Sequence, residues 1–118
     1  MIRPISELYN FINKEDALKL YNRCNEKKIY LATIFESKNL DSLGRGVYIF
    51  VNCFMEICYI GYSKDMSLRI KRHNKYIEND TIITINVNDI DIGKDLENEL
   101  ILLFKPKRNK IKRIYGRK

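Results

Sequence analysis

The sequence predicts one α+β domain, because three β-type runs are set among helical segments. Residues 46–52 and 56–62 are rich in β-branched and aromatic side chains and are joined by a short connection, which is the pattern of a β-hairpin. A third run of the same kind, 81–87, lies between two segments with helical periodicity. At 118 residues the chain has room for one hydrophobic core and little more.

The N-terminal part of the chain is expected to be mainly helical. A helix is predicted over residues 5–28, with a break near Asn13. Its expected apolar stripe at helical spacing is Leu18, Tyr21 and Cys24. Residues 29–35 fit either a strand or the end of this helix, and the pattern does not decide between the two.

A linker separates this part from the residues that carry chemistry. Residues 41–46 contain two glycines and small polar side chains and give the clearest linker signal in the chain. We therefore divide the sequence into an N-terminal extension packed on the domain, 1–45, a core, 46–110, and a basic tail, 111–118.

Two helices are expected to complete the core. Ser63 is a good N-cap for a helix over about 64–77. The expected face of this helix is Met66, Ile70, His73 and Ile77. A loop rich in Asn, Asp and Gly is expected over 88–93, and a second helix over about 94–104 ends before Pro106. The side chains that this second helix is expected to bury are Leu96, Leu100, Leu103 and Phe104.

The net charge of +7 is concentrated at the C-terminus. The last fourteen residues contain eight Lys or Arg and no acid, and without them the chain has 14 basic and 15 acidic residues. A second basic segment, 64–76, holds five Lys or Arg against one acid, whereas 77–104 holds one Lys and seven acids. This segregation is typical of a polyanion site beside a cation site, although a solvated surface with uneven charge would also produce it.

Cysteine usage and hydropathy indicate the environment of the chain. Three cysteines, no CxxC pattern and a single distant histidine argue against a zinc site or a disulfide framework. No run is long and apolar enough to span a bilayer, and the N-terminus lacks the apolar region of a signal peptide. We therefore expect a cytoplasmic location and no membrane partner.

The hairpin carries the most informative pattern in the chain. Gly46 and Tyr48 open its first run, and Tyr59 and Gly61 close the second, with ten residues between the two tyrosines. Glycine allows a backbone to approach a partner closely. A tyrosine in a strand is more often a packing residue, but the pairing of both tyrosines with glycines favours a functional site.

Arg69, His73 and Glu97 are candidates for phosphate and metal chemistry. Arg69 lies one helical turn before His73, and its guanidinium can bind two phosphate oxygens, although a surface arginine and a core histidine would be the simpler interpretation of each residue alone. Glu97 is expected to border the packed face of its helix, whereas Glu99 points about 200° away, toward solvent. A carboxylate beside a core is costly unless it is paired or holds a cation, and a single carboxylate suits Mg²⁺.

The order and spacing of these positions resemble the GIY-YIG endonucleases. The residues that carry the resemblance are Gly46-Val47-Tyr48, Tyr59-Ile60-Gly61, Arg69, His73, Glu97 and Asn109. The resemblance covers about residues 46–110 and implies a small central three-stranded antiparallel sheet flanked by helices. It also implies hydrolysis of phosphodiester bonds in DNA with one divalent cation, Mg²⁺ or Mn²⁺, so that each active site cuts one strand.

The resemblance also implies a role for each residue. Tyr48 is similar to the tyrosine proposed to activate the nucleophilic water, Tyr59 to a second tyrosine near the phosphate, and Arg69 to the arginine that stabilises the transition state. His73 falls where members carry His or Tyr, and Glu97 resembles the single metal ligand. The positions expected to support the site are Gly46, Gly61, Lys64 and Asn109.

Binding to DNA is expected to depend on basic residues around this core. Tyr62 stands where several members have Lys or Ser, and Lys64 is expected to supply that charge instead. The residues expected to contact DNA phosphates are Lys71, Arg72, Lys75, Lys107, Arg108, Lys110, Lys112 and Arg113. The sequence leaves open whether specificity comes from a homodimer, from a protein partner or from neither.

Two other functions remain open at this point. A non-catalytic nucleic-acid-binding or decoy protein could share the fold and the motif. A structural adaptor that faces a protein partner would show no salt-sensitive DNA binding. The presence of every expected site residue favours a nuclease.

Overall fold

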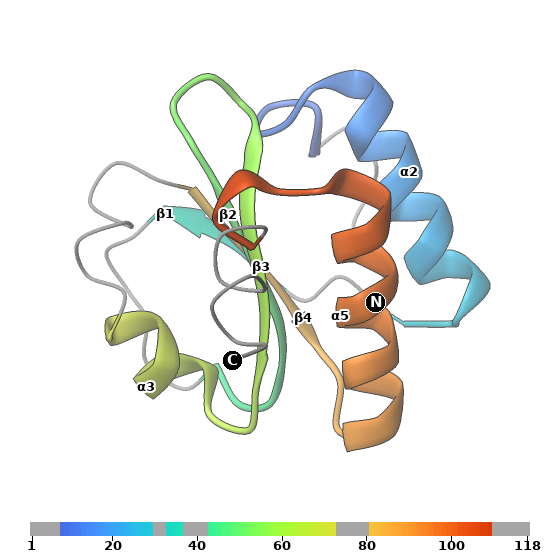
Figure 1. Ribbon diagram of the computed structural model, residues 1–118, viewed down its shortest axis with the longest axis vertical. Coiled ribbons are helices and arrows are strands. Elements are labelled where there is room, and N and C mark those ends of the chain that lie inside the picture. The colour runs from blue at the N-terminus through green and yellow to red at the C-terminus, as the bar shows by residue number, and fades with distance from the viewer. Residues whose placement is uncertain (1–7, 30–32, 37–42, 73–80, 110–118) are drawn as a thin grey trace.

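The structure, a computed structural model, describes residues 8–29, 33–36, 43–72 and 81–109. Three helices and four strands are present in this part of the chain, and the α+β class is confirmed (Figure 1). In chain order they are α2 (Lys14–Glu26), β1 (Thr33–Glu36), β2 (Gly46–Val51), β3 (Ile57–Ser63), α3 (Met66–Lys71), β4 (Thr81–Asn86) and α5 (Ile90–Phe104).

The strands form one antiparallel sheet in the order β1-β4-β2-β3. The predicted hairpin is β2 and β3, and the third predicted strand, β4, pairs with the other side of β2. Thr33–Glu36 overlaps the segment 29–35, which the sequence left open between strand and helix, and it is a fourth strand paired with β4. Within the described residues, β3 is therefore an edge strand and β2 lies in the interior of the sheet.

Helices cover the sheet on both faces, which explains why all six residues of β2 are buried. Figure 1 shows α2 and α5 on one side and α3 on the other. The α2 and α5 face is aliphatic, and its strand residues include Val47, Ile49, Ile60, Ile83 and Ile85. The α3 face is aromatic, and it includes Tyr48, Phe50, Tyr59, Met66 and Ile70.

The N-terminal extension shares its core with the rest of the domain. Leu8, Ile12 and Leu20 are fully buried in the same cluster as the strand residues of the aliphatic face. The predicted break near Asn13 is confirmed, because the Asn13 side chain accepts a hydrogen bond of 2.9 Å from the Asp16 N–H and caps α2.

The predicted apolar stripe of this helix is confirmed at Cys24, which is buried, and at Tyr21, which packs against the core, but it was wrong at Leu18. α2 buries Ala17, Leu20 and Cys24, whereas Leu18 is 43% exposed. Both sets of residues recur at helical spacing, so periodicity alone did not distinguish them. The position of α2 against the sheet and α5 decides which set is buried.

Two helix starts also differ from the prediction. Asp65, not Ser63, caps α3, because its carboxylate accepts a hydrogen bond of 3.1 Å from the Leu68 N–H. Ser63 instead fixes the turn before the cap through hydrogen bonds with the Asp65 backbone. The loop expected over 88–93 is wrong, since α5 begins at Ile90 after Asp89 caps it.

Gly93 lies inside α5 because a neighbouring ring occupies the space of a side chain. A Cβ atom at this position would stand 2.2 Å from Cε1 of Tyr62. This close approach lets α5 pack directly on β3 despite the low helix propensity of glycine. None of the helices in the described residues is long and apolar enough to cross a bilayer.

Thiol reactivity provides a test of this packing. Cys53 is exposed, whereas Cys24 and Cys58 are buried, and burial raises the pKa of Cys24 to about 12. The Cys58 thiol also donates a hydrogen bond of 3.3 Å to the Phe50 carbonyl. A thiol reagent added to the native protein is therefore expected to modify one cysteine within minutes and all three after denaturation. The Cys53→Ser variant should lose the rapid reaction, and rapid modification of two or more native thiols would contradict the fold.

Candidate active site

The two motif tyrosines lie on the same face of the β2–β3 hairpin. The strand register places Tyr48 opposite Gly61 and Tyr59 opposite Phe50. The ring centroids of Tyr48 and Tyr59 are 6.0 Å apart, and each lies 5.6 Å from the ring centroid of Phe50. The two tyrosines therefore belong to one aromatic cluster under α3.

Both motif glycines are required because neighbouring atoms occupy the space that a side chain would need. A Cβ atom on Gly61 would stand 2.5 Å from the Cζ and Oη atoms of Tyr48, so the tyrosine ring lies directly over the glycine. A Cβ atom on Gly46 would stand 2.0 Å from the carbonyl oxygen of Ile85, so this glycine lets β2 and β4 pair closely. Gly61 thus shapes the site itself, whereas Gly46 shapes the sheet that holds it.

Asn109 ties the end of α5 to the edge of the hairpin. The helix ends at Phe104, before Pro106 as predicted, and Lys105 adopts a left-handed φ of 48°. Asn109 is 4% exposed, and its Oδ1 accepts a hydrogen bond of 2.6 Å from the Ile60 N–H. Its Nδ2 donates a second hydrogen bond of 2.7 Å to the Ile60 carbonyl. Asn109 therefore satisfies the outer backbone groups of β3 between the motif residues Tyr59 and Gly61.

Arg69 of α3 and Glu97 of α5 bring opposite charges toward the tyrosines. Both side chains are half-buried. The positive charge of Arg69 lowers the pKa of Tyr48, and the negative charge of Glu97 raises it, so both charges lie near the Tyr48 hydroxyl. The structure thus brings Tyr48, Tyr59, Arg69 and Glu97 together from four elements that are separated in sequence.

Tyr48 is held as a neutral hydroxyl. Burial raises its pKa far above the ordinary value for tyrosine, and the neighbouring Tyr59 adds to this effect through its charge and a hydrogen bond. The opposing effect of Arg69 is smaller. Tyr48 has no exposed surface, so a substrate can reach its hydroxyl only after surrounding atoms shift.

Glu97 is the candidate carboxylate for binding a cation. Within the described residues, no group of three or more His, Cys, Asp and Glu side chains is clustered as a metal site. A single carboxylate can nevertheless hold Mg²⁺, because this cation keeps several waters and takes further oxygens from a bound phosphate. Glu97 lies near Tyr48, because its negative charge raises the pKa of that hydroxyl.

Glu99 does not face solvent as the sequence predicted. Its side chain is 36% exposed and bridges α5 to α2, with one oxygen 2.7 Å from Lys27 Nζ and the other 3.5 Å from Arg23 Nη1. The hydrogen bond that Lys27 donates to Glu99 raises the pKa of Lys27. The prediction was wrong because helical geometry gives the angle of Glu99 but not the position of α2.

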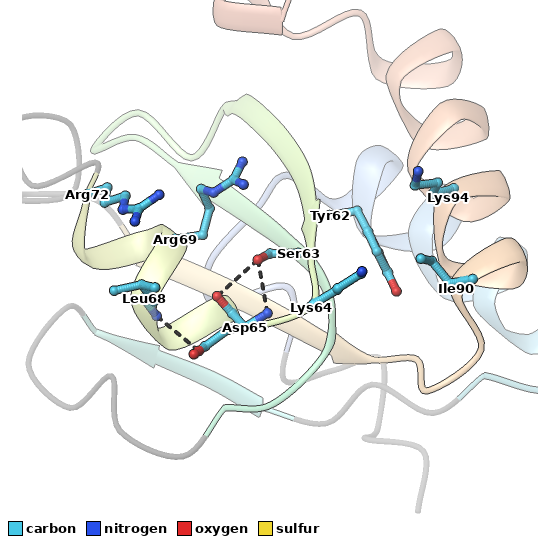
Figure 2. A pocket seen from close by; sticks show the side chains of 9 residues that line it. All are labelled: Tyr62, Ser63, Lys64, Asp65, Leu68, Arg69, Arg72, Ile90 and Lys94. Atoms are coloured by element: carbon cyan, nitrogen blue, oxygen red, sulfur yellow. Dashed lines mark hydrogen bonds between the residues drawn. The ribbon is translucent and has the colours of Figure 1, made fainter.

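A basic pocket of about 380 Å³ lies between α3 and α5 at the end of β3. Figure 2 shows Arg69 and Arg72 on its α3 side, Lys94 on its α5 side and Lys64 between them. Lys64, Arg69 and Arg72 were predicted as site or DNA-binding residues, whereas Lys94 was not. The signal that pointed to Lys94 was its position as the single lysine in an acidic segment, three residues before Glu97.

The remaining residues that were expected in the site or in DNA binding fall into two groups. Lys71 and Lys107 are exposed, and Arg108 is half-buried. His73, Lys75, Lys110, Lys112 and Arg113 lie outside the described residues. Their expected roles remain predictions.

Comparison of the chain with protein-family models and with curated proteins gave no match in either case.

The Asn109 contact predicts a loss of stability when it is removed. In Asn109→Ala, the buried N–H and C=O groups of Ile60 lose both partners, which should lower the free energy of unfolding by about 2–4 kcal/mol. Urea denaturation measures this change. Asn98→Ala, at an exposed position of α5, is the control and should stay within about 0.5 kcal/mol of the parent chain. Equal stability of the two variants would show that Asn109 does not hold the hairpin edge.

Proposed function

We propose that this protein is a metal-dependent DNA endonuclease of the GIY-YIG type, cutting one strand at each active site. The observation that carries the proposal is the convergence of Tyr48, Tyr59, Arg69 and Glu97 from β2, β3, α3 and α5. Hydrolysis of a phosphodiester needs an oriented water, positive charge at the phosphoryl oxygens and a cation, and this set of residues supports all three.

In this proposal the phosphate lies between Arg69 and Glu97. The Arg69 guanidinium binds the phosphoryl oxygens and stabilises the charge that develops as the bond breaks. Glu97 would hold Mg²⁺ or Mn²⁺, which would draw negative charge away from a phosphoryl oxygen. Tyr59 lies beside Tyr48 in the same aromatic cluster and limits the space around the phosphate.

Tyr48 acts in this proposal as a neutral hydroxyl that orients the attacking water. Its raised pKa argues against a resting phenolate. Its complete burial requires the atoms around it to shift when DNA binds. The proposed active site therefore opens on DNA binding and is closed in the free protein.

The burial of Tyr48 also supports a second candidate, a non-catalytic nucleic-acid-binding protein on the same fold. In that case Tyr48 only packs against Gly61, and the basic pocket binds DNA without cleavage. Metal-dependent nicking separates the two candidates. We place either protein in the cytoplasm, since its three cysteines are free thiols.

The first test of the nuclease is the conversion of supercoiled plasmid to open circles. The wild-type protein should nick with Mg²⁺ or Mn²⁺ and lose activity when a chelator is added. Glu97→Gln should abolish nicking and retain DNA binding, because the ring cluster and the basic pocket are unchanged. Asp95→Asn, an exposed carboxylate of the same helix, is the matched control and should nick at the parent rate. Equal activity of Glu97→Gln and Asp95→Asn would remove Glu97 as the metal ligand.

A second test separates charge stabilisation from water orientation. Arg69→Ala should lower the single-turnover rate by roughly 10²–10³, the scale for removing one preorganised charge stabiliser. Tyr48→Phe retains the ring over Gly61 but removes the hydroxyl that orients the water, and it should lower the rate by roughly 10². Rates are compared after denaturation shows that both variants have the same midpoint of unfolding as the parent protein. A parent-like rate in Tyr48→Phe would limit Tyr48 to packing.

A further inference from the structure

The cations of the basic pocket differ from Lys19, Arg23 and Lys27 of the α2 region, which have carboxylate partners. On α2, Lys19 lies 3.4 Å from Glu15, and Lys27 and Arg23 both pair with Glu99. Among the described residues, no ion pair involves the four cations of the pocket, which are Lys64, Arg69, Arg72 and Lys94. Four unpaired positive charges around one cavity repel each other, so the pocket is suited to an anionic ligand.

The acid that lines the pocket does not neutralise these charges. Asp65 is the acidic residue among the lining side chains, and its carboxylate accepts a hydrogen bond from the Leu68 N–H. Figure 2 shows this carboxylate turned toward the start of α3, on the opposite side from the Arg69 guanidinium. The centre of the pocket therefore faces lysine and arginine head groups.

Arg69 belongs to both the pocket and the aromatic site. Its side chain lines the pocket, and its charge acts on the Tyr48 hydroxyl. An anion in the pocket would therefore lie next to a phosphate held at Tyr48 and Glu97. In Figure 2, Lys64 and Lys94 lie on the side of Arg69 that is away from Arg72. Lys64 directly follows β3, and Lys94 lies near the start of α5.

The position of Lys94 depends on the contact between Tyr62 and Gly93. The Tyr62 ring fills the space beside Gly93 and forms the wall of the pocket next to Lys94. The Tyr62 hydroxyl is buried and has no hydrogen-bond partner among the described residues. This contact fixes α5 on β3 so that Lys94, one position further along the helix, reaches the pocket.

We propose that this pocket binds a second phosphate of the DNA strand, next to the one that is cut, and that Lys94 is its positioning residue. The identity of the strand rests on the proposed endonuclease function, whereas anion binding in the pocket does not. Lys94 acts on binding of the strand, because it stands apart from the water and the bond that breaks.

The experiment compares Lys94→Ala with Lys19→Ala in the full-length chain. Both changes remove one exposed lysine, but Lys19 lies on α2, away from the pocket. The first measurement, made in chelator, is the affinity for thymidine oligonucleotides with one internal phosphate (TpT) and with two (TpTpT). We expect the second phosphate to raise affinity about tenfold in the parent and in Lys19→Ala, on the scale of one charged hydrogen bond, and less than twofold in Lys94→Ala.

A second measurement addresses charge directly. The log–log salt slope of duplex binding should become shallower by about 0.9 in Lys94→Ala and stay unchanged in Lys19→Ala. Lys94→Arg keeps the charge and should restore the parent slope. In cleavage, Lys94→Ala should raise KM about tenfold with little change in kcat, on the same energy scale.

The outcomes separate the two proposals. If the second phosphate raises the oligonucleotide affinity only when Lys94 is present, and the protein does not cleave DNA, the pocket is supported and the nuclease is overturned. Cleavage with equal oligonucleotide affinities and salt slopes in Lys94→Ala and Lys19→Ala would support the nuclease and overturn the pocket. A fall in kcat with no change in KM would also contradict the positioning role.

Discussion

The site depends on the packing of Tyr48 over Gly61 across the β2–β3 hairpin. A side chain at position 61 would overlap the tyrosine hydroxyl, so the two motif residues form one structural unit. Tyr59 and Phe50 pack beside this pair, and Met66 and Ile70 bring α3 onto it. The position of Arg69 follows from this packing, because it lies on the same short helix.

Asn109 and Gly93 position the opposite side of the site. Asn109 hydrogen-bonds to β3 between Tyr59 and Gly61, and Gly93 lets α5 lie against Tyr62. Glu97 lies on α5 between these two contacts. Three local contacts thus hold a carboxylate, an arginine and two tyrosines near one another without a metal cluster in the described residues.

Local patterns in the sequence predicted much of this arrangement. The hairpin and its glycines were identified because runs of β-branched and aromatic residues, and glycine at fixed offsets, are short-range signals. The exposure of Leu18 on α2 and the partial burial of Glu99 on α5 were not predicted, because each depends on how α2 packs in the fold. The start of α5 was misassigned because Asn, Asp and Gly usually favour a loop, whereas here Asp89 caps a helix and Gly93 accommodates Tyr62. Lys94 was not predicted, because its isolated positive charge is a weak signal and the pocket joins residues from three elements.

The most direct test of the account is the location of a bound divalent cation. Mn²⁺ broadens the NMR signals of nearby amides, and it can be titrated into the protein together with a short DNA duplex. The account predicts that broadening is strongest around Glu97 on α5 and the adjoining residues of β3, and that Glu97→Gln abolishes it. Broadening that is centred elsewhere, or that is unchanged in Glu97→Gln, would contradict a catalytic metal at this site.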